Sequence, residues 1–133
     1  MATATLTRNT NLLRNALRGN SIFSAVSGAI LIAASGAVAA LMGIASAPLL
    51  LVIGISFVGG ALLMFYVTSR QPLSIPFARL VFTLDAAWVV ASAVILAFDL
   101  FGLTTEGRWI VLIVGDIVAL FAVAEYVGLR RAG

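Results

Sequence analysis

The sequence predicts an all-α integral membrane protein built as a four-transmembrane-helix bundle. Apolar residues make up 62% of the 133-residue chain, and its mean hydropathy is +1.17. Only 10% of the residues are charged, against about 25% in soluble domains. A bilayer core of about 30 Å needs roughly 20 residues of helix to cross it. Four apolar blocks of about that length occupy nearly the whole chain, so we expect one membrane domain, 1–133, with helices at 21–43, 47–67, 75–98 and 108–129.

The apolar blocks are predicted to be helices because apolar and polar residues do not alternate in them. Strands of membrane barrels alternate apolar and polar residues over about ten positions, whereas Leu49 to Ile53 are all apolar. The stretch Ala45-Ser46-Ala47 resembles a signal-peptide cleavage site, but the apolar run before it is longer than the usual 7–15 residues of a signal core. We therefore expect the first block to remain as a helix.

Residues 1–20 form an interfacial or cytoplasmic N-terminal segment. Within it, Leu13 and Leu17 are four residues apart, and so are Arg14 and Arg18. This periodicity is typical of a short amphipathic helix at the membrane surface. A cytoplasmic extension of the first spanning helix fits the pattern equally well.

Arginine placement predicts the orientation. Seven of the eight arginines are expected on one side of the membrane. One of them is Arg8, and the other six are expected to contact lipid headgroups: Arg14, Arg18, Arg70, Arg79, Arg130 and Arg131. The opposite side has Arg108 alone, near Asp99 and Glu106. Because positive charge is in excess on the cytoplasmic side, both termini should be cytoplasmic. We expect the bacterial cytoplasmic (inner) membrane, and no nucleic-acid partner, since the arginines follow a membrane face and do not gather in a folded basic patch.

The composition argues against an enzyme. The chain has no cysteine and no histidine, which excludes disulfides, thiolate metal sites, histidine-based metal sites and histidine general bases. No nucleophile paired with a base is visible. We therefore expect neither catalytic residues nor a metal or other cofactor.

A weak repeat groups the blocks into two tandem helical hairpins. An offset of 61 residues aligns Gly54 with Gly115 and Ala61 with Ala122 without a gap. Two hydrophobic hairpins can also align this well by chance, so duplication is one of two readings. Rows of small residues four apart, such as Ala25, Ala29 and Ala33, allow close helix contact. They could serve a monomer or an assembly, and we expect a homo-oligomer or other membrane protein subunits as partners, besides membrane lipids.

The candidate intramembrane polar site consists of Asp85, Asp116 and Trp88. A carboxylate at the centre of a spanning helix costs about 2.5–3.5 kcal/mol, so both aspartates should face the bundle interior or a water-filled cavity. They could meet near the middle of the membrane. Trp88 lies one turn after Asp85 on roughly the same face, where it either bonds Asp85 through an intervening group or packs in the core on the first helix. The aspartates either form a functional site or bond to neighbouring helices for structural reasons. Glu125 lies on the opposite face of the fourth helix from Asp116, near the cytoplasmic boundary, where Arg18, Arg79 or Arg130 could neutralise it.

Two short elements resemble a known group. Leu84-Asp85-Ala86-Ala87-Trp88 and the ending Gly128-Leu129-Arg130-Arg131 are similar to elements of small four-helix bacterial integral membrane proteins of unassigned function. The resemblance implies the four-helix topology and no activity.

These features predict a nonenzymatic small integral membrane protein that acts as a subunit or scaffold of an inner-membrane assembly. The extensive small-residue faces and the near absence of soluble parts favour that function. The alternative is a small transporter or channel that uses the intramembrane carboxylates Asp85 and Asp116.

Overall fold

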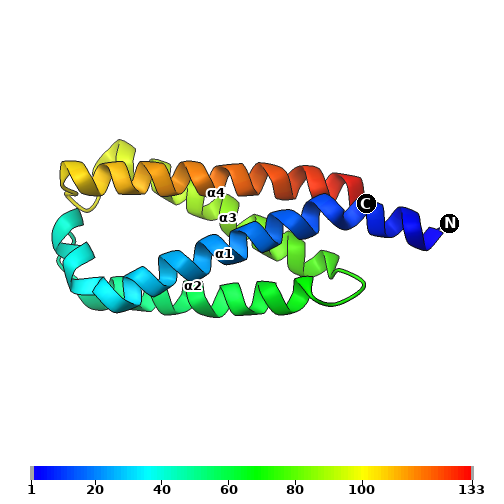
Figure 1. Ribbon diagram of the computed structural model, residues 1–133. Coiled ribbons are helices and arrows are strands. Elements are labelled where there is room, and N and C mark those ends of the chain that lie inside the picture. Colours follow the sequence, from blue (N-terminus) through cyan, green and yellow to red (C-terminus); the bar gives the residue numbers. More distant parts are fainter. Residues whose placement is uncertain (1, 133) are drawn as a thin grey trace.

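The computed structural model describes residues 2–132, with side chains from residue 10 onward, as a bundle of four helices (Figure 1). The helices are α1 (Ala2–Met42), α2 (Ala47–Thr68), α3 (Ile75–Phe98) and α4 (Thr105–Ala132). Each is long and apolar enough to cross a membrane. Large apolar side chains are exposed on all four helices, as lipid contact requires. The predicted all-α fold of four transmembrane helices is confirmed.

Serine and proline residues begin the two middle helices. Ser46 accepts a hydrogen bond from the backbone N–H of Leu49, and Ser74 accepts one from that of Phe77. Each cap is followed by a proline in the first turn of its helix, where the missing N–H costs nothing. These residues therefore fix where α2 and α3 begin.

The segment before residue 21 continues α1 and does not form a separate element. The helix runs unbroken through Gly19 and Asn20, and its backbone leaves the helical region at Ala34 (φ −132°, ψ 32°). Leu13 and Leu17 are completely buried, in a core cluster shared with the α2–α3 loop and the start of α3. Of the two predictions for residues 12–18, the extension of the first spanning helix is therefore correct, because the apolar face of this segment packs on protein.

Glycines mark the closest approaches between helices. A Cβ atom on Gly128 would lie 2.8 Å from the Cα of Leu13, and one on Gly107 would lie 2.5 Å from the carbonyl oxygen of Met42. Both contacts join α1 to α4, one near each end of the bundle. α1 also packs along α2, and α3 packs along α4, whereas α2 and α3 make almost no close contact along their lengths.

The two hairpins, α1–α2 and α3–α4, pack in the same register. A Cβ atom on Gly54 would lie 2.8 Å from the Cβ of Leu31, and one on Gly115 would lie 3.4 Å from the Cβ of Ser92. The offset of 61 residues relates Gly54 to Gly115 and also Leu31 to Ser92. Equivalent positions therefore meet in both hairpins, as the predicted pair of tandem hairpins requires.

Both termini lie at one end of the bundle, together with the loop of residues 69–74 between α2 and α3 (Figure 1). We call this the terminal end. In the same view α2 and α4 form two opposite edges, and α1 and α3 run diagonally between them.

Candidate functional site

A buried polar cluster joins three helices toward the terminal end. The side-chain amide of Asn20 on α1 donates hydrogen bonds to Asp85 Oδ2 on α3 (2.7 Å) and to Glu125 Oε2 on α4 (3.0 Å). Ser24, one turn further along α1, donates its hydroxyl to Asn20 Oδ1 (3.1 Å). We call these four residues the carboxyl cluster. One amide group thus holds two carboxyl groups from different helices.

The carboxyl cluster is largely buried, and no basic side chain of the described residues forms an ion pair with it. Glu125 is completely buried and Asn20 is 4% exposed, while Asp85 is half-buried. The second carboxyl oxygen of Glu125 is buried without a hydrogen-bond partner in the described part of the chain. None of the arginines described with side chains forms an ion pair with Glu125, so the possible neutralisation by Arg18, Arg79 or Arg130 is not what the structure shows. The site therefore presents acidic groups that no basic side chain balances.

Glu125 reaches the cluster because the inward face of α4 carries small residues. Val118, Ala122 and Gly128 are buried on the same face as Glu125, and Gly128 lies directly against α1. Such close packing brings the glutamate side chain within reach of Asn20. Sequence reasoning gave Glu125 little weight, although its place in this small-residue row could have identified it.

Asp116 lies outside the cluster. It is exposed on α4, and no hydrogen bond or ion pair is formed by it among the residues that the structure describes. The expected meeting of Asp85 and Asp116 in the interior therefore does not occur, because the face of α4 with Asp116 points away from the other helices. Asp85 instead shares its amide donor with Glu125.

Trp88 packs on the second helix. Its ring lies against Phe57 of α2 with the ring centroids 5.1 Å apart and the planes tilted by 57°. The indole Nε1 atom is buried and has no hydrogen-bond partner within the described residues. Of the two predictions for Trp88, packing in the core agrees with the structure. The ring packs on α2, however, and not on the first helix.

Two cavities occupy the space between α2 and α3. The smaller, of about 310 Å³, is lined by polar groups of Asn20, Ser24, Ser56 and Asp85 as well as by apolar side chains. The larger, of about 610 Å³, has almost wholly apolar walls contributed by all four helices. Phe57 and Trp88 line both cavities and stand where they meet.

Arg14 and Arg18 tie α1 to the α2–α3 loop. Arg14 is only 9% exposed. Its guanidinium donates to the carbonyl oxygen of Thr68, to that of Arg70 (3.2 Å) and to Gln71 Oε1 (3.1 Å). Arg18 donates to the same Thr68 carbonyl at 3.2 Å. Arg14 is therefore not free to bind lipid headgroups as expected. The other five are exposed, so headgroup contact stays a prediction for Arg18, Arg70, Arg79, Arg130 and Arg131.

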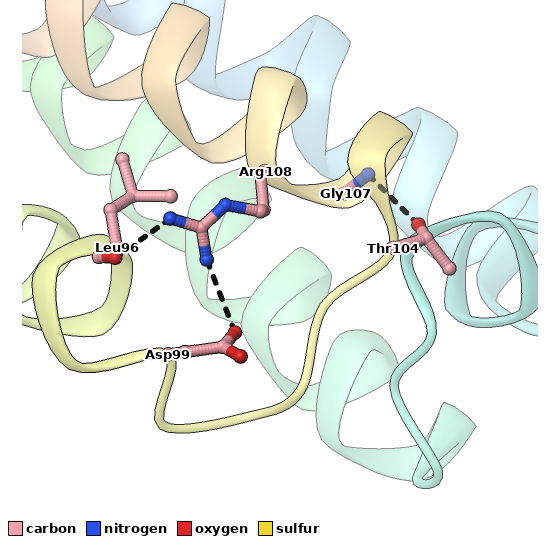
Figure 2. A network of polar contacts seen from close by, with 5 residues as sticks. All are labelled: Leu96, Asp99, Thr104, Gly107 and Arg108. Atoms are coloured by element: carbon pink, nitrogen blue, oxygen red, sulfur yellow. Dashed lines mark hydrogen bonds and ion pairs between the residues drawn. The ribbon is translucent and has the colours of Figure 1, made fainter.

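A second polar network lies at the opposite end of the bundle (Figure 2). Arg108 forms an ion pair with Asp99 (3.1 Å) and donates to the Leu96 carbonyl (2.9 Å), which links the start of α4 to the end of α3. The hydroxyl of Thr104 accepts from the Gly107 N–H (3.0 Å) and donates to the Leu41 carbonyl (2.5 Å). These contacts are exposed or half-buried and connect the ends of helices, so we assign them a role in stability.

Comparisons with protein-family models, with curated proteins and with solved structures find no match.

Proposed function

We propose that the protein is a nonenzymatic subunit of a membrane assembly and that the outward face of α4 binds a transmembrane helix of another protein. The observation that supports this proposal is the exposed carboxylate of Asp116 within a spanning helix. Exposed apolar side chains surround it on the same face, namely Leu112, Ile113, Leu120 and Val123.

The depth of Asp116 makes its exposure costly in a lone chain. Asp116 is 11 residues from the start of a 28-residue helix, or about 17 Å along its axis. A carboxylate at such a depth costs about 2.5–3.5 kcal/mol when it faces lipid. A neighbouring helix that offers a hydrogen-bond donor or a basic group at this depth would remove that cost.

Charge decides which partner fits. A two-fold contact between the α4 faces of two copies would bring two Asp116 carboxylates together, and like charges repel strongly at low dielectric. The face therefore fits a different protein whose spanning helix carries an amide, a hydroxyl or an arginine opposite Asp116.

The mass of the tagged protein, expressed at its native level and purified in mild detergent, tests this proposal. We expect a stoichiometric complex for the wild type and for Asp116→Asn, which keeps a hydrogen-bonding group, and the 13.8 kDa chain alone for Asp116→Leu. Leu62→Ala is the control, because Leu62 is also exposed and lies on a different helix, α2. A wild-type mass equal to one chain or to a multiple of it, or a complex that survives Asp116→Leu, would overturn the proposal.

The alternative of a transporter or channel built on Asp85 and Asp116 loses its geometric support. The structure separates the two carboxylates onto an inward and an outward face. We therefore do not propose a transporter or channel that uses these two carboxylates together.

We further propose that the terminal end faces the cytoplasm and that the membrane is the bacterial inner membrane. The exposed arginines at that end support this orientation, because positively charged residues are retained on the cytoplasmic side. A reporter that is active only outside the cytoplasm, fused after Gly133, should stay inactive. Activity of that fusion would reverse the orientation.

A further inference from the structure

The two hairpins face each other on two sides, α1 toward α4 and α2 toward α3, and these sides differ. The α1–α4 contact is closed by the glycine approaches at Gly128 and Gly107. The α2–α3 contact, which the repeat would make equivalent, is open and holds both cavities. The open side is therefore a specific departure from the symmetry of the fold.

The cavities have the size and lining of a small-molecule site. Volumes of about 610 and 310 Å³ lie in the range of about 300–1,000 Å³ that is usual for ligand pockets. Apolar side chains such as Leu31, Ile53 and Ile95 line the larger cavity. Such walls suit an apolar body that enters from the lipid.

The polar end of the site is acidic and unbalanced. Asp85 and Asn20 line the smaller cavity, and Glu125 lies directly behind them on the same amide. One oxygen of the completely buried Glu125 has no partner, and no arginine forms an ion pair with either carboxyl group in the described side chains. Phe57 and Trp88 add aromatic faces between the two cavities, where a cation is attracted by the ring electrons.

We propose that the space between α2 and α3 binds a lipophilic cation, with its positive group near Asp85 and its apolar body in the larger cavity. An anion would be repelled by the carboxyl groups, and a neutral apolar molecule would leave them unbalanced. The site does not use Asp116, so it is independent of the assembly proposed for α4.

Tryptophan fluorescence of the full-length chain in detergent tests this site. The chain has two tryptophans, so Trp109→Phe leaves Trp88 as the sole emitter. The probe is tetraphenylphosphonium, and the comparison is tetraphenylborate, which has the same shape and the opposite charge. We expect a saturable change in Trp88 emission with the cation and none with the anion.

Variants separate the charge from the cavity. Asp85→Asn should weaken cation binding at least about tenfold, since a close charge pair is lost. If Asp85→Asn does not fold, Glu125→Gln removes the other acidic group of the cluster and serves in its place. Asp116→Asn is the matched control and should bind as the parent does. Ala91→Phe should fill the larger cavity and abolish binding, whereas Ala93→Phe, exposed on the same helix and outside the cavity lining, should not.

Three results would overturn the proposal. One is an equal response to the phosphonium and the borate, which indicates partition into detergent. Another is a response that never saturates. The third is unchanged binding in folded Asp85→Asn or Ala91→Phe protein, which would mean that the cation binds elsewhere on the chain.

Discussion

The side-chain amide of Asn20 lies 3.0 Å from Glu125 Oε2, and this contact joins α1 to α4 across 105 residues of sequence. Asp85 binds the same amide from α3. In the low dielectric of a membrane interior, an unsatisfied polar group is costly. Asn20 therefore fixes the relative positions of three helices at one depth.

Substitution of Asn20 by leucine should destabilise the bundle more than any other single change in the carboxyl cluster. The amide donor is lost and two carboxyl groups remain, which we expect to cost about 3 kcal/mol. Ser24→Ala removes one hydrogen bond to the same residue and should cost about 1 kcal/mol. Unfolding in mixed micelles with rising dodecyl sulfate, followed by circular dichroism, measures both. Equal losses would show that the amide does not hold the cluster.

Close packing of α1 on α2 predicts opposite effects for two glycines of α2. At Gly54 an added Cβ would lie 2.8 Å from the Cβ of Leu31 and 3.0 Å from the Gly28 carbonyl oxygen, whereas at Gly59 it would meet nothing within 4 Å. Gly54→Ala should destabilise by about 1–3 kcal/mol through overpacking. Gly59→Ala should stabilise by up to about 1 kcal/mol through helix propensity. The same unfolding assay decides, and an equal sign for both would contradict the helix contact.

The number and approximate limits of the helices could be predicted because crossing a membrane imposes length and composition directly. The role of residues 12–18 could not. The spacing of Leu13 and Leu17 shows that one face is apolar, but the same face can lie on lipid or on protein. The structure buries these leucines against α2, the α2–α3 loop and the start of α3, and Gly128 of α4 also lies against Leu13. All of these contacts depend on residues that are distant in the sequence.

The candidate site could be predicted only in part, because the sequence does not show which face of α4 points inward. Asp85 was identified correctly as an interior group, but the wrong carboxylate of α4 was paired with it. Asp116 and Glu125 lie on opposite faces, and both faces are apolar in a membrane helix. Hydrophobic periodicity therefore cannot tell inside from outside, and the small residues Ala122 and Gly128 were the informative signal.

At the end of the bundle shown in Figure 2, Thr104 should contribute more stability than the nearby ion pair. Its hydroxyl caps α4 and also bonds the Leu41 carbonyl, so Thr104→Val should cost about 1–2 kcal/mol. Asp99→Asn removes an exposed ion pair with Arg108 and should cost less than about 1 kcal/mol. The two variants are compared by dodecyl sulfate unfolding at low salt, and a larger loss for Asp99→Asn would reverse this ranking.

Replacement of Arg14 by lysine should loosen the α2–α3 loop although the charge is kept. The guanidinium donates to Thr68, Arg70 and Gln71 from two different nitrogens, and a single ammonium group cannot reproduce that arrangement. We expect a loss of about 1–2 kcal/mol and cleavage after Arg70 by trypsin that is several-fold faster, because local opening of the loop exposes its backbone. Arg131→Lys is the control, since Arg131 is exposed on the last turn of α4. If both variants are cleaved at the wild-type rate, the loop is held by the burial of Leu73 in the core cluster and not by Arg14.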